Sequence, residues 1–311
     1  MTSPAATPVV EPVSDPVPGD DRWHFASGDA ITPELTTLRL LGGGTAYEAY
    51  LAFDEITYAP VVVKVVRPAQ ARDERTLRGL RREVETLMRV HHPAVVRQLR
   101  AELDGERPHV VLENLDGPRL STLIRRYGAL EPAQYLPLGI EIASALHYFR
   151  RIDLLHLDVK PSNIIVGAPA RLIDLSVARS SGRAAALTYP VGTDFYMAPE
   201  QCAPPHTGVP VPASDVWGLG ATMFEAVAGY RAFDDGDEHA EAAAGRFPQL
   251  RDEPYGLPEH VPPVVADLIG ACLSTDPALR PSPAQVADAL GPVLENQPRG
   301  RLGGFKTALS R

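Results

Sequence analysis

The chain has 311 residues, of which 44% are hydrophobic and 22% are charged, and its formal net charge at pH 7 is -9. A chain of this length and apolar content can bury a large core, which excludes general disorder and indicates one large domain or two lobes. The acidic balance disfavours nucleic acid and anionic membranes as partners, because both require a basic surface.

The two cysteines, Cys202 and Cys272, provide neither a disulfide framework nor the ligand spacing of a zinc site. The N-terminus lacks the basic-then-apolar pattern of a secretion signal, and no uninterrupted run of about eighteen apolar residues occurs. We therefore expect a cytoplasmic protein without a membrane span.

Both ends of the chain differ in composition from the middle. We predict a flexible Pro-rich leader over residues 1–30, because its repeated prolines interrupt any regular helix. Residues 293–311 are predicted to form a short basic tail. For both ends, solvated chain is the expected state.

Residues 31–113 are predicted to form a small lobe built on an antiparallel sheet. Short apolar runs between Ile31 and Val66 indicate consecutive strands, of which residues 61–66 (VVVKVV) are the clearest. Leucine and valine recur at helical spacing from residue 77 to 87, which predicts an amphipathic helix that stops before Pro93. Strands are expected again near Val95 and at residues 110–112.

Residues 114–292 are predicted to form a larger, mostly helical lobe. Helical patterns cover about residues 132–151, 214–229 and 262–273. The expected fold class is therefore α+β, with a sheet lobe that carries one main helix and precedes the helical lobe.

A glycine-rich turn lies between two of the predicted strands, directly after Leu41. Gly42, Gly43 and Gly44 would let the backbone approach phosphate oxygens that any Cβ atom would crowd. A hairpin turn without a ligand would explain the glycines equally well.

Two charges fall where apolar residues are expected. Lys64 interrupts the apolar strand 61–66, and Glu83 lies on the inward stripe of the predicted helix. Because each charge is costly to bury alone, we predict that they form one buried ion pair. A snorkelling lysine with a surface glutamate is the alternative.

The third group of polar residues lies in the run from His156 to Asn163 and in the following Asp174. Asp158 can accept a proton from a hydroxyl, whereas Asn163 and Asp174 are oxygen ligands suited to Mg²⁺. Lys160 adds a positive charge beside them. A plain polar turn is the alternative for residues 158–163.

These motifs resemble the protein kinase family over about residues 34–291, and most closely the soluble bacterial serine/threonine kinases of eukaryotic (Hanks) type. The family's catalytic loop reads H-R-D-x-x-x-x-N and its metal loop D-F-G. This chain keeps the reacting positions and departs from the pattern at five others. The departures are Tyr47 for the third loop glycine, Val62 for the usual alanine, Leu157 for the arginine, and Leu175 and Ser176 for Phe-Gly.

The resemblance implies a two-lobed protein kinase-like fold and transfer of the ATP γ-phosphate to Ser/Thr hydroxyls of protein substrates, with Mg²⁺ or alternatively Mn²⁺. Asp158 would take the proton, Lys160 would steady the γ-phosphoryl group, and Lys64, held by Glu83, would bind the α- and β-phosphates. The metal would be held by Asn163 and Asp174. The nucleotide would contact Leu41, Gly42, Gly43, Gly44, Ala49, Val62, Lys64, Ile165 and the backbone around Glu113 and Leu115.

The resemblance also covers the segment before the last helices. Thr193 matches a threonine that hydrogen-bonds the catalytic aspartate and lysine in serine/threonine kinases. Glu200, in Ala-Pro-Glu, is expected to pair with Arg280, and Asp215 to anchor the catalytic-loop backbone. Leu175 would act as an apolar plug under the helix that bears Glu83.

Leu157 replaces the arginine that binds activation-segment phosphate in many kinases. The segment from Ser176 to Gly192 has few hydroxyl groups, chiefly those of Ser180, Ser181, Thr188 and Tyr189. We therefore hypothesise that activity does not require phosphorylation of this segment.

Two other functions remain open at this point. A pseudokinase or nucleotide-sensing scaffold would bind nucleotide without phosphotransfer, and Tyr47, Leu157 and Ser176 leave room for it. A small-molecule phosphotransferase of related fold is disfavoured by the peptide-docking segment from Thr193 to Glu200. The sequence leaves the physiological substrate and the oligomeric state open.

Overall fold

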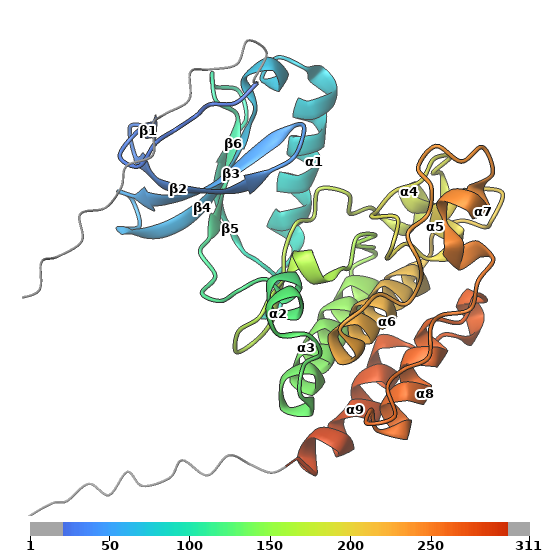
Figure 1. Cartoon of the computed structure of the whole chain (residues 1–311). Helices are drawn as coiled ribbons and strands as arrows, with labels where there is room; N and C mark the ends of the chain where they lie inside the picture. The colour runs from blue at the N-terminus through green and yellow to red at the C-terminus, as the bar shows by residue number, and fades with distance from the viewer. Residues whose placement is uncertain (1–20, 298–311) are drawn as a thin grey trace, which may run out of the picture.

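The computed structural model of the chain describes residues 21–297 and divides them into two lobes (Figure 1). The smaller lobe holds a six-stranded antiparallel sheet in the order β1-β2-β3-β4-β6-β5 and one long helix, α1 (Glu74–Arg89). The strands are β1 (Ala30–Thr32), β2 (Leu35–Gly43), β3 (Tyr47–Asp54), β4 (Ala59–Val66), β5 (Gln98–Glu102) and β6 (His109–Glu113). The predicted α+β fold class with a sheet lobe and a helical lobe is confirmed.

The two faces of the sheet differ because side chains alternate along each strand. On β4, Val61, Val63 and Val65 lie in the core of the outer face, whereas Val62 and Lys64 point to the face that carries α1. The register pairs Ala49 of β3 with Lys64 and Tyr47 with Val66, so all four residues share that inner face. The sheet therefore presents Lys64 toward α1 and toward the other lobe.

Helix α1 begins where the side chain of Asp73 accepts a hydrogen bond from the Thr76 amide at 2.7 Å, which caps the first turn. Its stripe of Leu80, Val84 and Leu87 belongs to the main hydrophobic core. The helix ends at Arg89, just before the His-His-Pro sequence. The predicted helix is therefore confirmed: it begins three residues before Leu77 and ends just before the sequence that was expected to stop it.

Residues 21–30 pack against the small lobe, so the leader predicted for residues 1–30 extends too far. Trp23 stacks on Phe25, its indole N–H donates to the Val66 carbonyl at 2.8 Å, and its backbone N–H donates to Glu48 at 3.0 Å. The guanidinium of Arg107 covers both rings. These aromatic contacts outweigh the proline-rich composition that predicted solvated chain. Residues 1–20 lie outside the described residues.

Replacing Trp23 by alanine should lower the free energy of unfolding by about 2 kcal/mol, below the value for a fully buried aromatic because the side chain is only half-buried. Trp23→Phe keeps most of the ring contact but loses the indole donor, so its loss should be smaller. Urea unfolding of the three proteins measures the difference. Equal midpoints for wild type and Trp23→Ala would show that residues 21–30 contribute nothing to the lobe.

The larger lobe follows β6 and is mostly helical (Figure 1). Its elements are α2 (Leu120–Tyr127), α3 (Pro132–Arg151), β7 (Ile164–Ile165), β8 (Arg171–Leu172), α4 (Ser181–Ala185), α5 (Pro199–Cys202), α6 (Pro212–Ala228), α7 (Ala243–Arg246), α8 (Pro263–Cys272) and α9 (Pro283–Glu295). The three predicted helices correspond to α3, α6 and α8. Among residues 21–297, no helix is long and apolar enough to cross a membrane.

Two boundaries differ from the prediction. The strand expected near Val95 begins at Gln98, because Val95 and Val96 are buried against the larger lobe, where the Val96 N–H donates to Leu172 at 2.9 Å. Residues 293–295 belong to α9 and not to the predicted tail. The part of that tail after residue 297 is outside the described residues.

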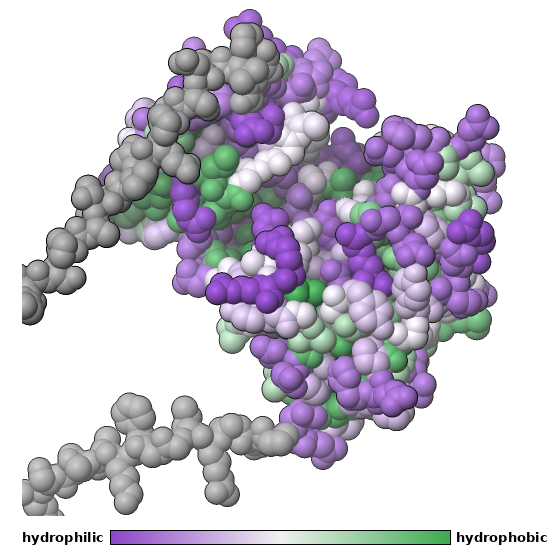
Figure 2. Space-filling model, viewed as in Figure 1, coloured by the Kyte–Doolittle hydropathy of each residue, from purple (hydrophilic) through white to green (hydrophobic). Residues whose placement is uncertain are grey.

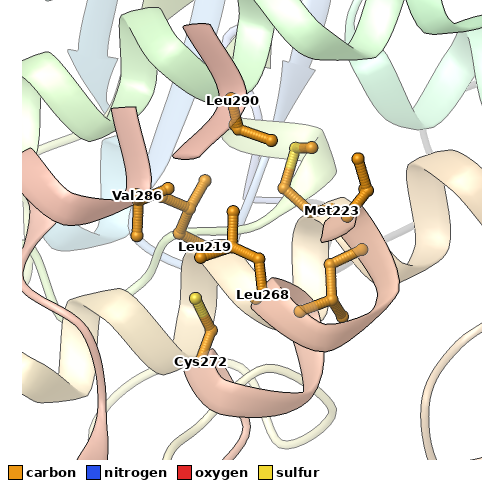
Figure 3. Close-up of a pocket in the computed structure, with 9 residues that line it drawn as sticks. Leu219, Met223, Leu268, Cys272, Val286 and Leu290 are labelled. Carbon is orange, nitrogen blue, oxygen red and sulfur yellow. The ribbon is translucent and has the colours of Figure 1, made fainter. Parts of the chain in front are cut away.

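The core of the larger lobe is tightly filled where α6, α8 and α9 meet (Figure 3). Leu219, Met223, Cys272 and Leu290 point toward one another there, and only about 10 Å³ of space remains between them. This volume matches about one water molecule. The gap therefore has no room for a small-molecule ligand.

Candidate active site

The candidate site lies between the lobes, where the inner face of the sheet meets the loops before β7 and after β8. Figure 2 shows a recess between the lobes, with hydrophobic side chains visible inside it and mostly hydrophilic side chains around it. Charged residues from distant parts of the chain form two groups here. Lys64 contacts Glu83 and Asp174, and Asp158 contacts Lys160.

Lys64 and Glu83 form the predicted buried ion pair. The Nζ atom of Lys64 lies 2.9 and 2.8 Å from the two carboxylate oxygens of Glu83 and 3.2 Å from Oδ1 of Asp174. The Glu83 side chain is 2% exposed and the Lys64 side chain 14%. The ammonium group of Lys64, on β4, therefore contacts both α1 and the segment after β8.

The charges of this cluster are coupled. Burial disfavours the charged form of Lys64, but the carboxylates of Glu83 and Asp174 outweigh this effect and raise its pKa. Burial likewise opposes ionisation of Asp174, yet Lys64 and the hydrogen bond from Ser176 hold the pKa of Asp174 well below its usual range. Asp174 is therefore an anion at neutral pH, as a cation ligand must be.

The catalytic-loop residues form a second connected group around Asp158. Thr193 donates its hydroxyl to Oδ1 of Asp158 at 2.7 Å, and Lys160 lies 2.7 Å from Oδ2. The side-chain amide of Asn163 donates to the same Oδ2 and to the Asp158 carbonyl, both at 3.0 Å. These contacts fix the carboxylate in one orientation before any substrate arrives.

Asp215, on α6, holds the backbone of this loop through hydrogen bonds. Its two carboxylate oxygens accept hydrogen bonds from the amides of His156 and Leu157, each at 2.7 Å. Leu157 has φ 65°, a left-handed conformation that is unfavourable for a leucine. The buried carboxylate compensates for this conformation, so α6 determines the direction in which Asp158 points.

The glycine-rich turn has the tight shape that its sequence predicts. Gly42 has φ 144°, and a Cβ atom on Gly43 would lie 2.6 Å from the Tyr47 carbonyl oxygen, so neither position accepts a side chain easily. Leu41, Gly42 and Gly43 are the last residues of β2, whereas Gly44 follows the strand and has open space around it. Neither Tyr47 nor Ser176 has a positive φ, so each replaces the family's glycine without backbone strain.

The residues predicted around adenine come from the sheet of the small lobe, from β7 and from the segment after β6. Ala49 and Val62 are half-buried on the inner face of the sheet beside Lys64, and Ile165 of β7 bridges to residue 119, just past the crossover between the lobes. The Glu113 side chain turns away to accept from the Arg97 amide at 2.8 Å. Within residues 21–297, the Leu115 backbone makes no hydrogen bond, so its donor and acceptor are available.

The donors suit a divalent cation that is shared with phosphate. Asn163 uses its amide nitrogen on Asp158, which leaves its carbonyl oxygen, and Asp174 supplies an ionised carboxylate. No group of three or more His, Cys, Asp or Glu ligands occurs in residues 21–297. This set fits Mg²⁺, which is usually bound through one or two protein oxygens together with phosphate and water.

The segment after Asp174 is anchored at its far end, at Glu200 and Gln201. Glu200 forms the predicted ion pair with Arg280, at 2.7 and 2.9 Å, and accepts from Ser214 at 2.6 Å. Sequence reasoning missed Gln201, whose amide donates to the carbonyls of Leu157 and Val191. Its place beside the Ala-Pro-Glu motif was the only available signal.

Leu157 occupies an apolar cluster in place of the charged site that an arginine would form. It is buried with Leu155, Ala184, Leu187 and Val191, so α4 and the residues after it pack directly on the catalytic loop. Leu175 is buried in the main hydrophobic core, which also contains the apolar stripe of α1, and its role as a plug under that helix stays a prediction.

Comparison with known proteins decides the family. The family model described as "Protein kinase domain" matches residues 35–289 of the chain. The chain belongs to the protein kinase family.

Several bacterial serine/threonine-protein kinases are similar to this kinase-family chain. PknK of Mycobacterium tuberculosis is 34% identical over 232 residues, which cover 72% of the chain and 20% of PknK. PknB of Mycobacterium leprae is 31% identical over 225 residues, or 69% of the chain and 35% of PknB. A serine/threonine-protein kinase of Corynebacterium efficiens is 29% identical over 271 residues, or 84% of the chain and 51% of that kinase. The chain thus spans about half or less of the length of these relatives.

Proposed function

We propose that the protein is a serine/threonine protein kinase that transfers the γ-phosphate of ATP to hydroxyl groups of protein substrates. The observation that carries this proposal is the contact of Asp158 with Thr193 and Lys160, beside a Lys64–Glu83 pair that also reaches Asp174. These residues form two hydrogen-bonded groups, and the backbone bond from Ile173 to the Asn163 carbonyl, at 2.8 Å, links the segments that carry them. Together they include the kinds of group that phosphoryl transfer requires.

In the proposed reaction, Asp158 accepts the proton of the substrate hydroxyl, whose oxygen attacks the γ-phosphorus while the bond to the ADP oxygen breaks. Lys160 lies 2.7 Å from Asp158, where its positive charge can also offset the negative charge of the γ-phosphoryl group during transfer. Lys64 orients the α- and β-phosphates, and Glu83 keeps the ammonium group in place.

Asn163 and Asp174 are proposed to hold Mg²⁺, which supplies positive charge that neutralises the phosphates as negative charge shifts to the leaving group. Adenine would lie between the side chains of Ala49, Val62 and Ile165. The free backbone groups of Leu115 would recognise its edge.

The choice of a serine or threonine hydroxyl rests on Thr193, which bridges Asp158 and Lys160 in the position that the resemblance predicted. Incubation with γ-labelled ATP, Mg²⁺ and dephosphorylated casein, followed by acid hydrolysis, should yield labelled phosphoserine or phosphothreonine. Label recovered only as phosphotyrosine or on a small molecule would contradict the proposal.

Activity is also proposed to be independent of phosphorylation of the activation segment. The apolar cluster around Leu157 attaches α4 to the catalytic loop, and Gln201 ties the same loop to Val191. Apolar packing would thus hold the activation segment against the catalytic loop, as an arginine bound to a phosphate does in other kinases.

Alanine variants of Thr188 and of the pair Ser180 and Ser181 should keep phosphotransfer rates within about twofold of wild type, the range for surface substitutions. Leu157→Ala should lower the rate, because it opens the apolar cluster. Initial-rate assays of protein first treated with a phosphatase make the comparison. Loss of most activity in the folded hydroxyl variants would instead assign a phosphate to Arg82, Arg179 and Arg183, whose charges lie close together.

A further inference from the structure

We propose that Tyr47 is a positioning residue that ties the glycine-rich turn to α1 and so keeps the Lys64–Glu83 pair closed. The inference rests on the proposed kinase function, because its consequence is the placement of Lys64 on the phosphates. It gives a role to the one residue that most clearly departs from the family's glycine pattern.

The phenol ring of Tyr47 connects three elements. It extends from the first residue of β3 on the inner face of the sheet, and its hydroxyl donates to the Thr76 carbonyl of α1 at 3.0 Å. The Nζ atom of Lys64 lies 4.8 Å from the ring centroid, within the range of a cation–π contact. One side chain thus contacts both the helix that carries Glu83 and the lysine that Glu83 holds.

The helix is shaped to accept this hydroxyl. Gly79 faces it, and a Cβ atom at that position would lie 3.2 Å from the Tyr47 oxygen, which is tighter than ordinary packing. Gly79 is not needed for a left-handed backbone, since its φ is that of the surrounding helix. A glycine in the middle of a helix is unfavourable by itself, so the space that it leaves for Tyr47 explains its presence.

The hydroxyl is a stable donor. Burial raises the pKa of Tyr47, and the nearby charge of Lys64 only partly opposes this effect. The phenol is therefore protonated at neutral pH and can donate a hydrogen bond. The bond is made near the first turn of α1, seven residues before Glu83, or about 10 Å along the helix axis.

The contact opposes any outward movement of α1. Such a movement would separate Glu83 from Lys64, break the bond to Thr76 and expose the ring and the ion pair to water. The helix is also held by its apolar stripe, by the ion pair of Arg81 with Asp104 and by the hydrogen bond from Arg89 to the Ile152 carbonyl. Tyr47 adds a direct link from the turn that covers the phosphates, so nucleotide-loop position and helix position are coupled.

The first test compares Tyr47→Phe and Tyr47→Gly with wild type, and uses Tyr58→Phe, at an exposed residue, as the matched control. Tyr47→Phe should lower kcat about two- to tenfold, the range for one neutral hydrogen bond, and leave the KM for ATP within about twofold. Tyr47→Gly, which removes the ring as well, should lower kcat further. Higher kcat in Tyr47→Gly would overturn the proposal, because the tyrosine would then be an obstruction.

The second test is independent of phosphotransfer. Amide hydrogen exchange in the first two turns of α1 should be about two- to tenfold faster in Tyr47→Phe, whereas Tyr58→Phe should match wild type. If wild type binds nucleotide without transferring phosphate, the proposed function fails but this readout still decides the role of Tyr47. Unchanged exchange in Tyr47→Phe would overturn that role.

Gly79→Ala gives a further check, because it should change the rate of amide exchange in α1 in opposite directions with and without Tyr47. In wild type the new methyl group crowds the hydroxyl, so exchange in α1 should speed up. In the Tyr47→Gly background the same methyl group meets open space and favours the helix, so exchange should slow. The same effect of Gly79→Ala in both backgrounds would contradict direct contact between the two positions.

Discussion

Asp158→Asn should lower the rate of phosphotransfer by about 10²- to 10⁴-fold, the contribution usually made by a general base. Asparagine has the same shape but cannot accept the proton of the substrate hydroxyl. Thr193 can still donate to its side-chain oxygen, so the loop should stay in place. Initial rates with γ-labelled ATP and a protein substrate measure the effect.

The control for Asp158→Asn is Asp267→Asn, the same chemical change at an exposed position on α8. Both variants should show the nucleotide-dependent rise in melting temperature of wild type, because neither residue belongs to the adenine side of the site. A rate for Asp158→Asn within threefold of the control would remove Asp158 from the proposed mechanism.

Glu83→Ala should reduce both stability and phosphotransfer. Removal of one partner from a buried ion pair costs about 3–5 kcal/mol, because the other charge stays buried without it. Lys64 would keep only Asp174, which it reaches at 3.2 Å, and would turn from the phosphates toward that carboxylate. Urea unfolding and initial rates of the same preparation give the two quantities.

Two further variants test whether the effect of Glu83→Ala comes from the loss of the buried ion pair. Glu85→Ala changes an exposed glutamate on the same helix and should leave both stability and rate close to those of wild type. The double variant Lys64→Met/Glu83→Leu removes both charges, so it should recover most of the lost stability but no activity. A fully active and equally stable Glu83→Ala protein would show that the pair has no role.

Much of the site could be predicted from the sequence because its residues conflict with their surroundings. Lys64 breaks an apolar strand and Glu83 lies on an apolar helix stripe, and the structure joins the two at 2.8 Å. The helical spacing of the apolar residues was strong enough to place α1, α3 and α6. Asp158 and Asp174 stood out because short polar motifs surround them.

Other features depend on contacts that the sequence does not show. Two aromatic residues, Trp23 and Phe25, end a proline-rich segment. Nothing in the neighbouring sequence indicates that Trp23 contacts Arg107 and the Val66 carbonyl, which lie far along the chain. Helices α2, α4, α5 and α7 are too short for a clear period, and the tertiary structure fixes them. Helix α9, although longer, was missed as well.

The contacts of the residues that depart from the family pattern could not be predicted from the sequence either. From the sequence, Tyr47 and Leu157 are only substitutions at positions where glycine and arginine are expected. The structure shows the contacts that the two side chains make instead: a hydrogen bond from Tyr47 to Thr76, and an apolar cluster that contains Leu157. Both depend on residues distant along the chain.

The most direct test of kinase activity is the intact mass of the purified protein during incubation with ATP and Mg²⁺, with and without casein, next to Asp158→Asn. The proposal predicts phosphate-sized mass increments on the protein or on casein with wild type only. No increment on either, together with stabilisation by nucleotide, would contradict it and would favour a pseudokinase that binds nucleotide as a scaffold or sensor.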